Sequence, residues 1–384
     1  MIKVMLEGIV YILYGVLLFV AVIIARQLRF ALKHFTPPAY ITKLGEEVDV
    51  PSVTVCIPAR NEMHAVAECL DKVIASDYQR LEIIVLDDGS NDQTSSLIKA
   101  YAHEGVRFVQ GDPMPQGWLG KNHALKGLLK EASGSYVLFM DIDTRITPTA
   151  ISNLVRYALS QRASMVSVLP RREDGWRASV LFSPLRYFWE LIFHRRAAPA
   201  SASNAWLIHR HAFLEQFGGF EQFKTAVQPE SAIAAVLSRT NAYRFLISTQ
   251  QFGVGYEKKW RSQLVTSTRL LFPSLNSKLS MALVAVFDLL FLLIPTAVII
   301  LFAGKPFGIV QAGATVLFIL YALLYGIYTH RVWAKGAFLG ALLWPVIILQ
   351  EAILVCASAL QYKRKTVTWK GRNVLQGREF KAKR

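Results

Sequence analysis

Two aspartates, Asp141 and Asp143, stand with one isoleucine between them at the end of the apolar run Tyr136–Met140. In an extended chain, residues i and i+2 share a face, so both carboxylates can point into one site. Neighbouring carboxylates repel each other, and burying either is costly without a partner. The spacing therefore indicates a positive partner such as a divalent metal ion, with a solvated turn as the alternative.

Two further polar clusters follow apolar runs earlier in the chain. Arg60-Asn61-Glu62 comes shortly after Ser52–Ile57, and Asp87-Asp88 comes directly after Leu81–Leu86. Asp and Asn also favour turns, because their side chains bond the local backbone. Three such clusters at equivalent strand ends nevertheless favour one shared ligand site over three unrelated turns.

The elements that must position these clusters alternate between strands and helices from Pro51 to about Tyr256. Strands are expected at Ser52–Ile57, Leu81–Leu86, Val106–Gln110 and Tyr136–Met140, and helices at Met63–Ala75, from Ser90 to about His103, and at Asn122–Ala132. The alternation predicts an α/β fold, with a mostly parallel, Rossmann-like sheet flanked by helices. Ligands of such sheets bind beyond the carboxyl ends of the strands.

The chain has 384 residues, of which 53% are hydrophobic, and much of that excess lies in a few apolar segments. These segments are Gly8–Ala25, Ser280–Gly304, Pro306–Thr329 and Gly336–Tyr362. Each is long enough to cross a bilayer core of roughly 30 Å at about 1.5 Å per residue. Because Arg26, Arg29 and Lys33 follow the first segment, we interpret it as an anchor with the following domain in the cytosol, rather than as a signal peptide.

The net charge of +16 is concentrated in the tail Gln361–Arg384, which holds nine Lys or Arg residues and one Glu. A basic tail beside an apolar segment indicates attraction to anionic lipid, so no nucleic-acid partner is expected. The three cysteines have no spacing typical of a disulfide framework or a metal site, which suits a reduced cytosolic domain.

The expected plan has an N-terminal transmembrane anchor, a cytosolic domain and C-terminal membrane helices. The boundaries are 1–30 for the anchor, 48–257 for the cytosolic domain, 258–280 for an amphipathic region, 281–362 for two or three spans and 363–384 for the basic tail. The amphipathic region is expected to lie in the membrane interface, with packing on the soluble domain as the alternative. Glu351, inside the last apolar segment, is expected to face protein or water. These features predict a multi-pass protein of the plasma membrane.

Five motifs resemble those of family 2 glycosyltransferases with the GT-A fold. They are IPARNE (Ile57–Glu62), LDDGS (Leu86–Ser90), GWLGKNHAL (Gly117–Leu125), FMDIDT (Phe139–Thr144) and GGF (Gly218–Phe220). Each is weak alone, but their order along the chain is specific. The resemblance covers roughly Val53 to Tyr256 and the flanking membrane segments. More narrowly, it is to the membrane-anchored bacterial branch that glycosylates hopanoid, carotenoid or related lipids.

The resemblance implies a nucleoside diphosphate sugar, with a UDP-sugar as the expected donor. The donor-binding residues that it implies are Pro58, Arg60, Asn61, Glu62, Asp88, Gly120, Lys121 and Asp141. Lys121 would supply a mobile charge for a phosphate, and a solvated lysine is the alternative. Asp143 would be the direct ligand of Mg²⁺ or Mn²⁺.

The acceptor side is implied to include Asn204, Trp206 and Gly219, near the GGF motif. Trp206 could stack on a sugar or lipid, and the alternative is a core position on a strand.

The family usually carries a Glu-Asp pair at the start of a helix, and this Asp acts as the general base. This chain instead has Pro229-Glu230-Ser231. Matching motif letters would leave Ser231 as the base, which cannot work unaided. Matching helix phase places Ile233 and Leu237 three and seven residues after Glu230, so Glu230 is the predicted catalytic base. An ordinary carboxylate at a helix N-terminus is the alternative.

These features predict an integral membrane glycosyltransferase that is metal-dependent and inverting, with a lipid acceptor drawn from the bilayer. One alternative is a processive polysaccharide synthase of the same fold, although no Q-x-x-R-W motif occurs. A second is a membrane pseudoenzyme that binds a nucleotide sugar without transferring it, which the missing Glu-Asp pair favours.

Overall fold

The computed structural model describes residues 2–38, 50–173, 178–333, 337–369 and 372–374. The chain divides into two compact units, named here the sheet unit and the helical unit. The sheet unit comprises Phe35–Glu173, His194–Glu257 and Lys365–Arg384, and the helical unit comprises Met1–His34, Asp174–Phe193 and Lys258–Arg364.

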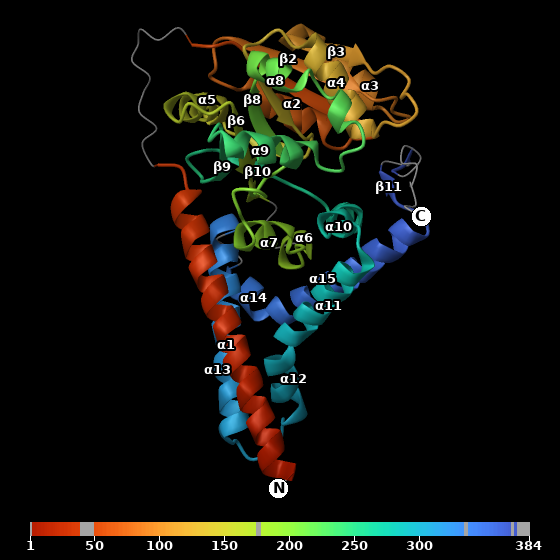
Figure 1. Ribbon diagram of the computed structural model, residues 1–384. Coiled ribbons are helices and arrows are strands. Elements are labelled where there is room, and N and C mark those ends of the chain that lie inside the picture. The colour runs from red at the N-terminus through yellow and green to blue at the C-terminus, as the bar shows by residue number, and fades with distance from the viewer. Residues whose placement is uncertain (1, 39–49, 174–177, 334–336, 370–371, 375–384) are drawn as a thin grey trace. The chain divides into compact units, whose positions relative to one another are not determined.

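The main sheet of the sheet unit has seven strands in the order β3-β2-β1-β4-β8-β6-β9 (Figure 1). Their bounds are β1 Val53–Ala59, β2 Leu81–Asp87, β3 Val106–Gln110, β4 Tyr136–Met140, β6 Met165–Leu169, β8 Ala205–His209 and β9 Tyr243–Ile247. Strands β1 to β4 are parallel, as is the β6–β9 pair, while β8 runs antiparallel to both β4 and β6. The predicted mostly parallel sheet is confirmed.

Shorter strands and the flanking helices complete the sheet unit. A second sheet has the order β5-β10-β7, and β11 and β12 form a separate antiparallel pair. These strands are β5 Thr144–Ile146, β7 Arg171–Arg172, β10 Val254–Tyr256, β11 Thr368–Trp369 and β12 Arg372–Asn373. The helices are α2 Val66–Ile74, α3 Thr94–Ala100, η1 Tyr101–Glu104, α4 Gly120–Glu131, α5 Ala150–Ser160, α8 Arg210–Phe217, η2 Glu221–Phe223 and α9 Pro229–Arg239.

Strand β1 continues past Pro58, where the sequence had predicted that it would stop. Pro58 lies opposite Leu86 of β2, but β4 pairs with β1 only as far as Cys56. Beyond Cys56, β1 pairs with β2 but no longer with β4. Proline has no N–H to donate, and on the side where β4 has ended no strand requires one. The strand therefore reaches Ala59 and brings the next three residues to the edge of the sheet.

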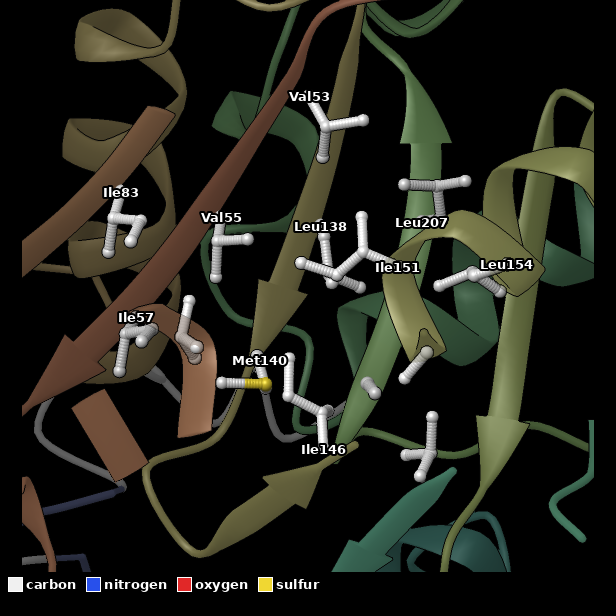
Figure 2. Close-up of a cluster of buried hydrophobic side chains, with 14 of the residues drawn as sticks. Val53, Val55, Ile57, Ile83, Leu138, Met140, Ile146, Ile151, Leu154 and Leu207 are labelled. Carbon is white, nitrogen blue, oxygen red and sulfur yellow. The ribbon is translucent and has the colours of Figure 1, made fainter. Parts of the chain in front are cut away.

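One face of this sheet packs into an apolar core. Alternate residues of β1, Val53, Val55 and Ile57, point to the same side and are fully buried (Figure 2). They pack with β4 and with helix α5, which contributes Ile151 and Leu154. This core fixes the positions along the sheet at which β1 and β4 end. It therefore also fixes the positions of the polar residues that follow these strands.

All secondary structure elements of the helical unit are helices, among the residues that the structure describes. They are α1 Ile2–His34, α6 Ala178–Leu181, α7 Arg186–Ile192, α10 Trp260–Ser274, α11 Leu279–Leu292, α12 Ile294–Leu301, α13 Ile309–Val332, α14 Ala337–Leu342 and α15 Trp344–Lys363. In the described part of the chain, three stretches are long and apolar enough to cross a membrane: Gly8–His34, Ile309–Val332 and Trp344–Lys363. A fourth would arise if α10 and α11, which meet at 118°, counted as one broken span.

The apolar segment Ser280–Gly304 does not form the single helix that its composition predicted. It is divided between α11 and α12, with a break at Leu293 and Pro295 in the first turn of α12. Helices of 14 and 8 residues are each too short to cross the bilayer core alone. Proline is favoured at a helix start, so a new helix begins where the sequence suggested continuity.

Helices α10 and α15 are joined by hydrogen bonds inside the helical unit. The Ser358 hydroxyl donates to the Thr268 carbonyl at 2.5 Å and accepts from the Phe272 amide at 2.9 Å. Glu351 of α15 is 1% exposed and accepts from the Leu185 amide at 3.1 Å. Glu351 therefore faces protein, as the sequence predicted.

Candidate active site

Three adjacent parallel strands end in the polar clusters that the sequence singled out. Strand β1 lies between β2 and β4, so Arg60-Asn61-Glu62, Asp87-Asp88 and the Asp141–Asp143 turn leave the sheet at neighbouring positions. The carboxyl edge of a parallel sheet is where such folds bind ligands. The sheet thus gathers the predicted donor residues of all three strands along one edge.

The loops after β1 and β2 are tied to each other through Asn61, which has a positive φ of 51°. The Asn61 amide donates to the Ser90 hydroxyl at 2.9 Å, and its side-chain oxygen accepts from the Asn91 amide at 2.8 Å. Arg60 donates to the carbonyls of Asp88 and Gly89. Asn61 and Arg60 therefore fix the loop geometry by bonding backbone groups. Such bonding was the alternative to ligand binding in the sequence analysis.

The two aspartates of the LDDGS motif have different surroundings. The Asp87 carboxylate accepts hydrogen bonds from Ser90 and Ser95, so it holds the start of the next helix in place. Asp88 is 4% exposed, and its amide donates to the Ala59 carbonyl at 2.9 Å. Asp88 is thus held against the end of β1, and its binding of base or ribose stays a prediction.

Lys121, in the first turn of α4, forms an ion pair with Asp141. The Lys121 Nζ atom lies 2.6 Å from Asp141 Oδ1, and the side chains are 15% and 23% exposed. Gly120 is the first residue of the helix. A cation and backbone N–H groups at a helix start suit the negative charge of a phosphate. The alternative of a freely solvated lysine is therefore wrong.

A buried asparagine that the sequence analysis missed, Asn122, links this helix to the segment before α9. Its side-chain amide donates to the carbonyls of Phe223 at 2.6 Å and Ala226 at 2.8 Å. The Leu119 amide also donates to the Lys224 carbonyl at 2.9 Å. The GWLGK loop and the chain leading to Glu230 are thus held in a fixed relation.

The turn between β4 and β5 places the two aspartates of the DID motif toward different partners. Asp141 pairs with Lys121, while an Asp143 carboxylate oxygen lies within 4.8 Å of ligand atoms of Glu62 and His64. The Asn204 carbonyl accepts from the Asp141 amide at 2.8 Å and from the Thr144 hydroxyl at 2.9 Å. Asn204, predicted on the acceptor side, therefore supports this turn.

Arg145 anchors the same turn from inside the protein, a role that the sequence analysis did not identify. Its guanidinium donates to the carbonyls of Ile142 at 2.9 Å and Thr144 at 3.1 Å, and to Glu68 Oε2 at 2.7 Å. The hydrogen bond from Arg145 lowers the pKa of the Glu68 carboxyl below its usual value. Arg145 therefore holds the turn through two backbone carbonyls and an ion pair with Glu68.

The potential metal ligands around Asp143 suit a divalent cation. Two carboxylates and an imidazole offer three ligand atoms within 4.8 Å of one another, in a group where Glu62 is buried and His64 exposed. Oxygen ligands of this kind suit Mg²⁺ and Mn²⁺. His64 was not recognised in the sequence, although a Glu and a His two residues apart after a strand could have signalled it.

Glu230 lies at the second position of α9, directly after Pro229. Its side chain is 1% exposed, and its Oε1 atom is buried without a hydrogen-bond partner among the described residues. Ile233 and Leu237 are buried on the same helix, as the phase argument predicted. A buried carboxylate oxygen without a partner is costly, which sets Glu230 apart from an ordinary solvated carboxylate at a helix start.

Trp206 occupies the core instead of an accessible acceptor surface. It is 1% exposed on β8, and its ring packs 4.4 Å from the Phe139 ring and 6.4 Å from that of Phe220. Stacking on a sugar or lipid is therefore excluded for Trp206 in this structure. Gly218 and Gly219 both have positive φ, at 65° and 115°, so the GGF turn needs glycine at these positions.

Comparison with known proteins agrees with this arrangement. Residues 54–222 match the model of glycosyl transferase family 2. Residues 54–222, most of which lie in the sheet unit, form a family 2 glycosyltransferase domain. The glycosyltransferase domain thus spans the strands and motifs from β1 to the GGF turn.

A relative and a solved structure extend the comparison. The 4,4'-diaponeurosporenoate glycosyltransferase of Staphylococcus aureus (strain bovine RF122 / ET3-1) is 31% identical over 121 residues, which is 31% of this chain and 32% of that protein. A Pyrobaculum calidifontis mannosyltransferase in complex with GDP-Man and Mn²⁺ is 18% identical with a TM-score of 0.54, covering 96% of this chain and all 100% of that one. The glycosyltransferase domain has the GT-A fold.

Proposed function

We propose that this protein transfers a sugar from a nucleoside diphosphate sugar to a lipid acceptor. The observation that supports it most is the Lys121–Asp141 ion pair at the carboxyl edge of the sheet in a family 2 domain. The donor is proposed to be a UDP-sugar. Because the mannosyltransferase of similar fold holds GDP-Man, uridine and guanosine donors need to be compared directly.

Donor binding is assigned to the loops at the edge of the sheet. Asp88 accepts from the base or ribose, with Pro58, Arg60 and Asn61 shaping the loop beside it. Lys121 donates to a diphosphate oxygen while it keeps its ion pair with Asp141, and Gly120 presents the helix N-terminus. An ammonium group has three donors, so it can contact phosphate while staying near Asp141.

Asp143, with Glu62 beside it, would hold a divalent cation, Mg²⁺ or Mn²⁺. When bound, such an ion would neutralise charge on the departing nucleoside diphosphate. The residues of this chain supply the rest: Arg145 holds the turn, and Asn204 supports it through its carbonyl.

Glu230 is the proposed general base. Its unpaired Oε1 accepts the proton of an acceptor hydroxyl. The acceptor oxygen then bonds to the anomeric carbon as the bond to the diphosphate oxygen breaks on the opposite side. One such displacement inverts the configuration at that carbon.

A lipid acceptor is supported by the helical unit and by the printed name of the Staphylococcus aureus relative. We propose that residues 48–257, which include the glycosyltransferase domain, lie on the cytosolic face of the plasma membrane.

The test incubates the purified full-length protein with UDP- or GDP-sugars, Mn²⁺ and membrane lipid. Product analysis by mass spectrometry should find a glycosylated lipid, and NMR should find the anomeric configuration inverted. Donor binding without transfer to any lipid would favour the pseudoenzyme, and a growing saccharide chain would favour the polysaccharide synthase.

A further inference from the structure

The loop after β1 contributes a second potential cation ligand besides Glu62. Glu62, His64 and Asp143 each offer one ligand atom, and these atoms all lie within 4.8 Å of one another. His64 Nε2 lies 3.7 Å from Glu62 Oε2. The 3.7 Å separation is longer than a hydrogen bond. All three separations are short enough for a single ion to contact all three side chains.

The backbone around these three side chains is held in place before any ion binds. The Glu62 amide donates to the Thr94 hydroxyl at 2.8 Å, and the Met63 amide donates to Asp92 at 3.3 Å. The Asp143 carbonyl accepts from the Glu257 amide at 3.1 Å. Metal ligands that are already held in place lower the free-energy cost of assembling a site around an ion.

The charges of this cluster also favour a cation. Two carboxylates so close together repel each other, and a divalent ion between them would turn that repulsion into attraction. The neighbouring cation Arg145 forms an ion pair with Glu68 at 2.7 Å. The competing interpretation is an ordinary ion pair between protonated His64 and Glu62.

We propose that His64 is a nitrogen ligand of the divalent cation, together with Glu62 and Asp143, and that the site therefore selects Mn²⁺ over Mg²⁺. Mg²⁺ is bound mainly through oxygen and water, whereas an imidazole ligand favours transition-metal ions. The His64 side chain is 48% exposed, so the remaining coordination positions are open to water and substrate. The ion's role in sugar transfer rests on the proposed function, but its coordination does not.

The test measures Mn²⁺ coordination in the full-length, tag-free protein in detergent, without nucleotide. Electron spin echo envelope modulation of bound Mn²⁺ should show ¹⁴N coupling from a directly bound imidazole. In His64→Gln this coupling should disappear, and Mn²⁺ affinity should fall about tenfold or more, since even indirect supports of a metal ligand are worth 10–100-fold. Because His64 is exposed, this variant should fold.

The matched control is His211→Gln. His211 forms a similar pair, with Nδ1 3.6 Å from Glu215 Oε2, on the exposed surface of α8. This variant should keep the ¹⁴N coupling and the Mn²⁺ affinity of the unmutated protein. In competition, Mg²⁺ should displace Mn²⁺ only at a large excess from the unmutated protein, and at a smaller excess from His64→Gln.

Absence of ¹⁴N coupling in the unmutated protein, or its persistence in His64→Gln, would overturn the assignment. Equal competition by Mg²⁺ and Mn²⁺ would overturn the selectivity. Sugar transfer, measured separately, distinguishes this failure from failure of the proposed function. Transfer without ¹⁴N coupling would refute the role of His64 alone, whereas coupling without transfer would leave His64 as a ligand and refute the glycosyltransferase activity.

Discussion

Lys121 and Asp141 join two separate elements, the first turn of α4 and the end of β4, through an ion pair of 2.6 Å. Both side chains are mostly buried, at 15% and 23% exposed, so the pair is shielded more than a surface salt bridge would be. A phosphate arriving here meets a lysine whose position is already fixed. The pair therefore connects helix packing to donor binding.

Replacing Lys121 by Met should weaken nucleoside diphosphate binding about 10–100-fold, because a charge-assisted hydrogen bond contributes about 1.5–3 kcal/mol. Isothermal titration with UDP measures it. Lys126→Met is the matched control, since Lys126 lies on the same helix, is 45% exposed and pairs with Glu221. Equal UDP affinity of the Lys121 and Lys126 variants would remove Lys121 from the donor site.

Arg145→Met should reduce turnover because it displaces Asp143. Glu68→Gln should reduce turnover less, because it only removes one bond that holds Arg145. Loss of the buried guanidinium frees the carbonyls of Ile142 and Thr144, and a shift of about 1 Å in a catalytic group can cost roughly a hundredfold in rate. The readout is Mn²⁺ affinity together with turnover. A turnover loss with unchanged Mn²⁺ affinity would contradict a positioning role for Arg145.

The Glu68–Arg145 bond should also give a pH-dependent stability. The pKa of the Glu68 carboxyl in the folded protein lies below the ordinary value of 4.5. The bond's contribution to the free energy of unfolding is therefore fully present above pH 4.5, and it is lost as the pH falls through the folded-state pKa. The midpoint of thermal unfolding should therefore be lower in Glu68→Gln than in the unmutated protein at pH 7. That difference should shrink below pH 4.5, and a constant difference would argue against the ionic contribution.

Glu230→Gln keeps the size of the side chain but removes the base. Turnover on a hydroxyl acceptor should fall roughly 10²–10⁴-fold with UDP binding retained. A carboxylate acceptor is already ionised at neutral pH and needs no base, so its transfer should be much less affected. An unchanged rate on a hydroxyl acceptor would place the base elsewhere.

Local sequence patterns predicted the parts of the fold that depend on local chemistry. The apolar runs at Leu81–Leu86 and Tyr136–Met140 became β2 and β4, and the polar residues after them lie at one sheet edge. Residue spacing also predicts which face of α9 is buried. Ile233 and Leu237, three and seven residues after Glu230, were therefore predictable as buried residues.

Other features depend on contacts between distant segments, which local patterns do not contain. The antiparallel direction of β8 and the core position of Trp206 follow from pairing with β4. Arg145 acquires its role from Glu68, 77 residues away in sequence, and His64 acquires its own from Asp143. The break between α11 and α12 had a local signal, Pro295, that continuous apolar composition concealed.

The most direct test of sugar transfer compares membranes from cells that express the protein with membranes from cells that do not. The membranes are incubated with UDP-sugar or GDP-sugar, and their lipids are then analysed by mass spectrometry. The account predicts a lipid that is heavier by one sugar residue only in membranes that contain the protein. Identical lipid profiles with both donors, despite nucleotide binding by the protein, would contradict it.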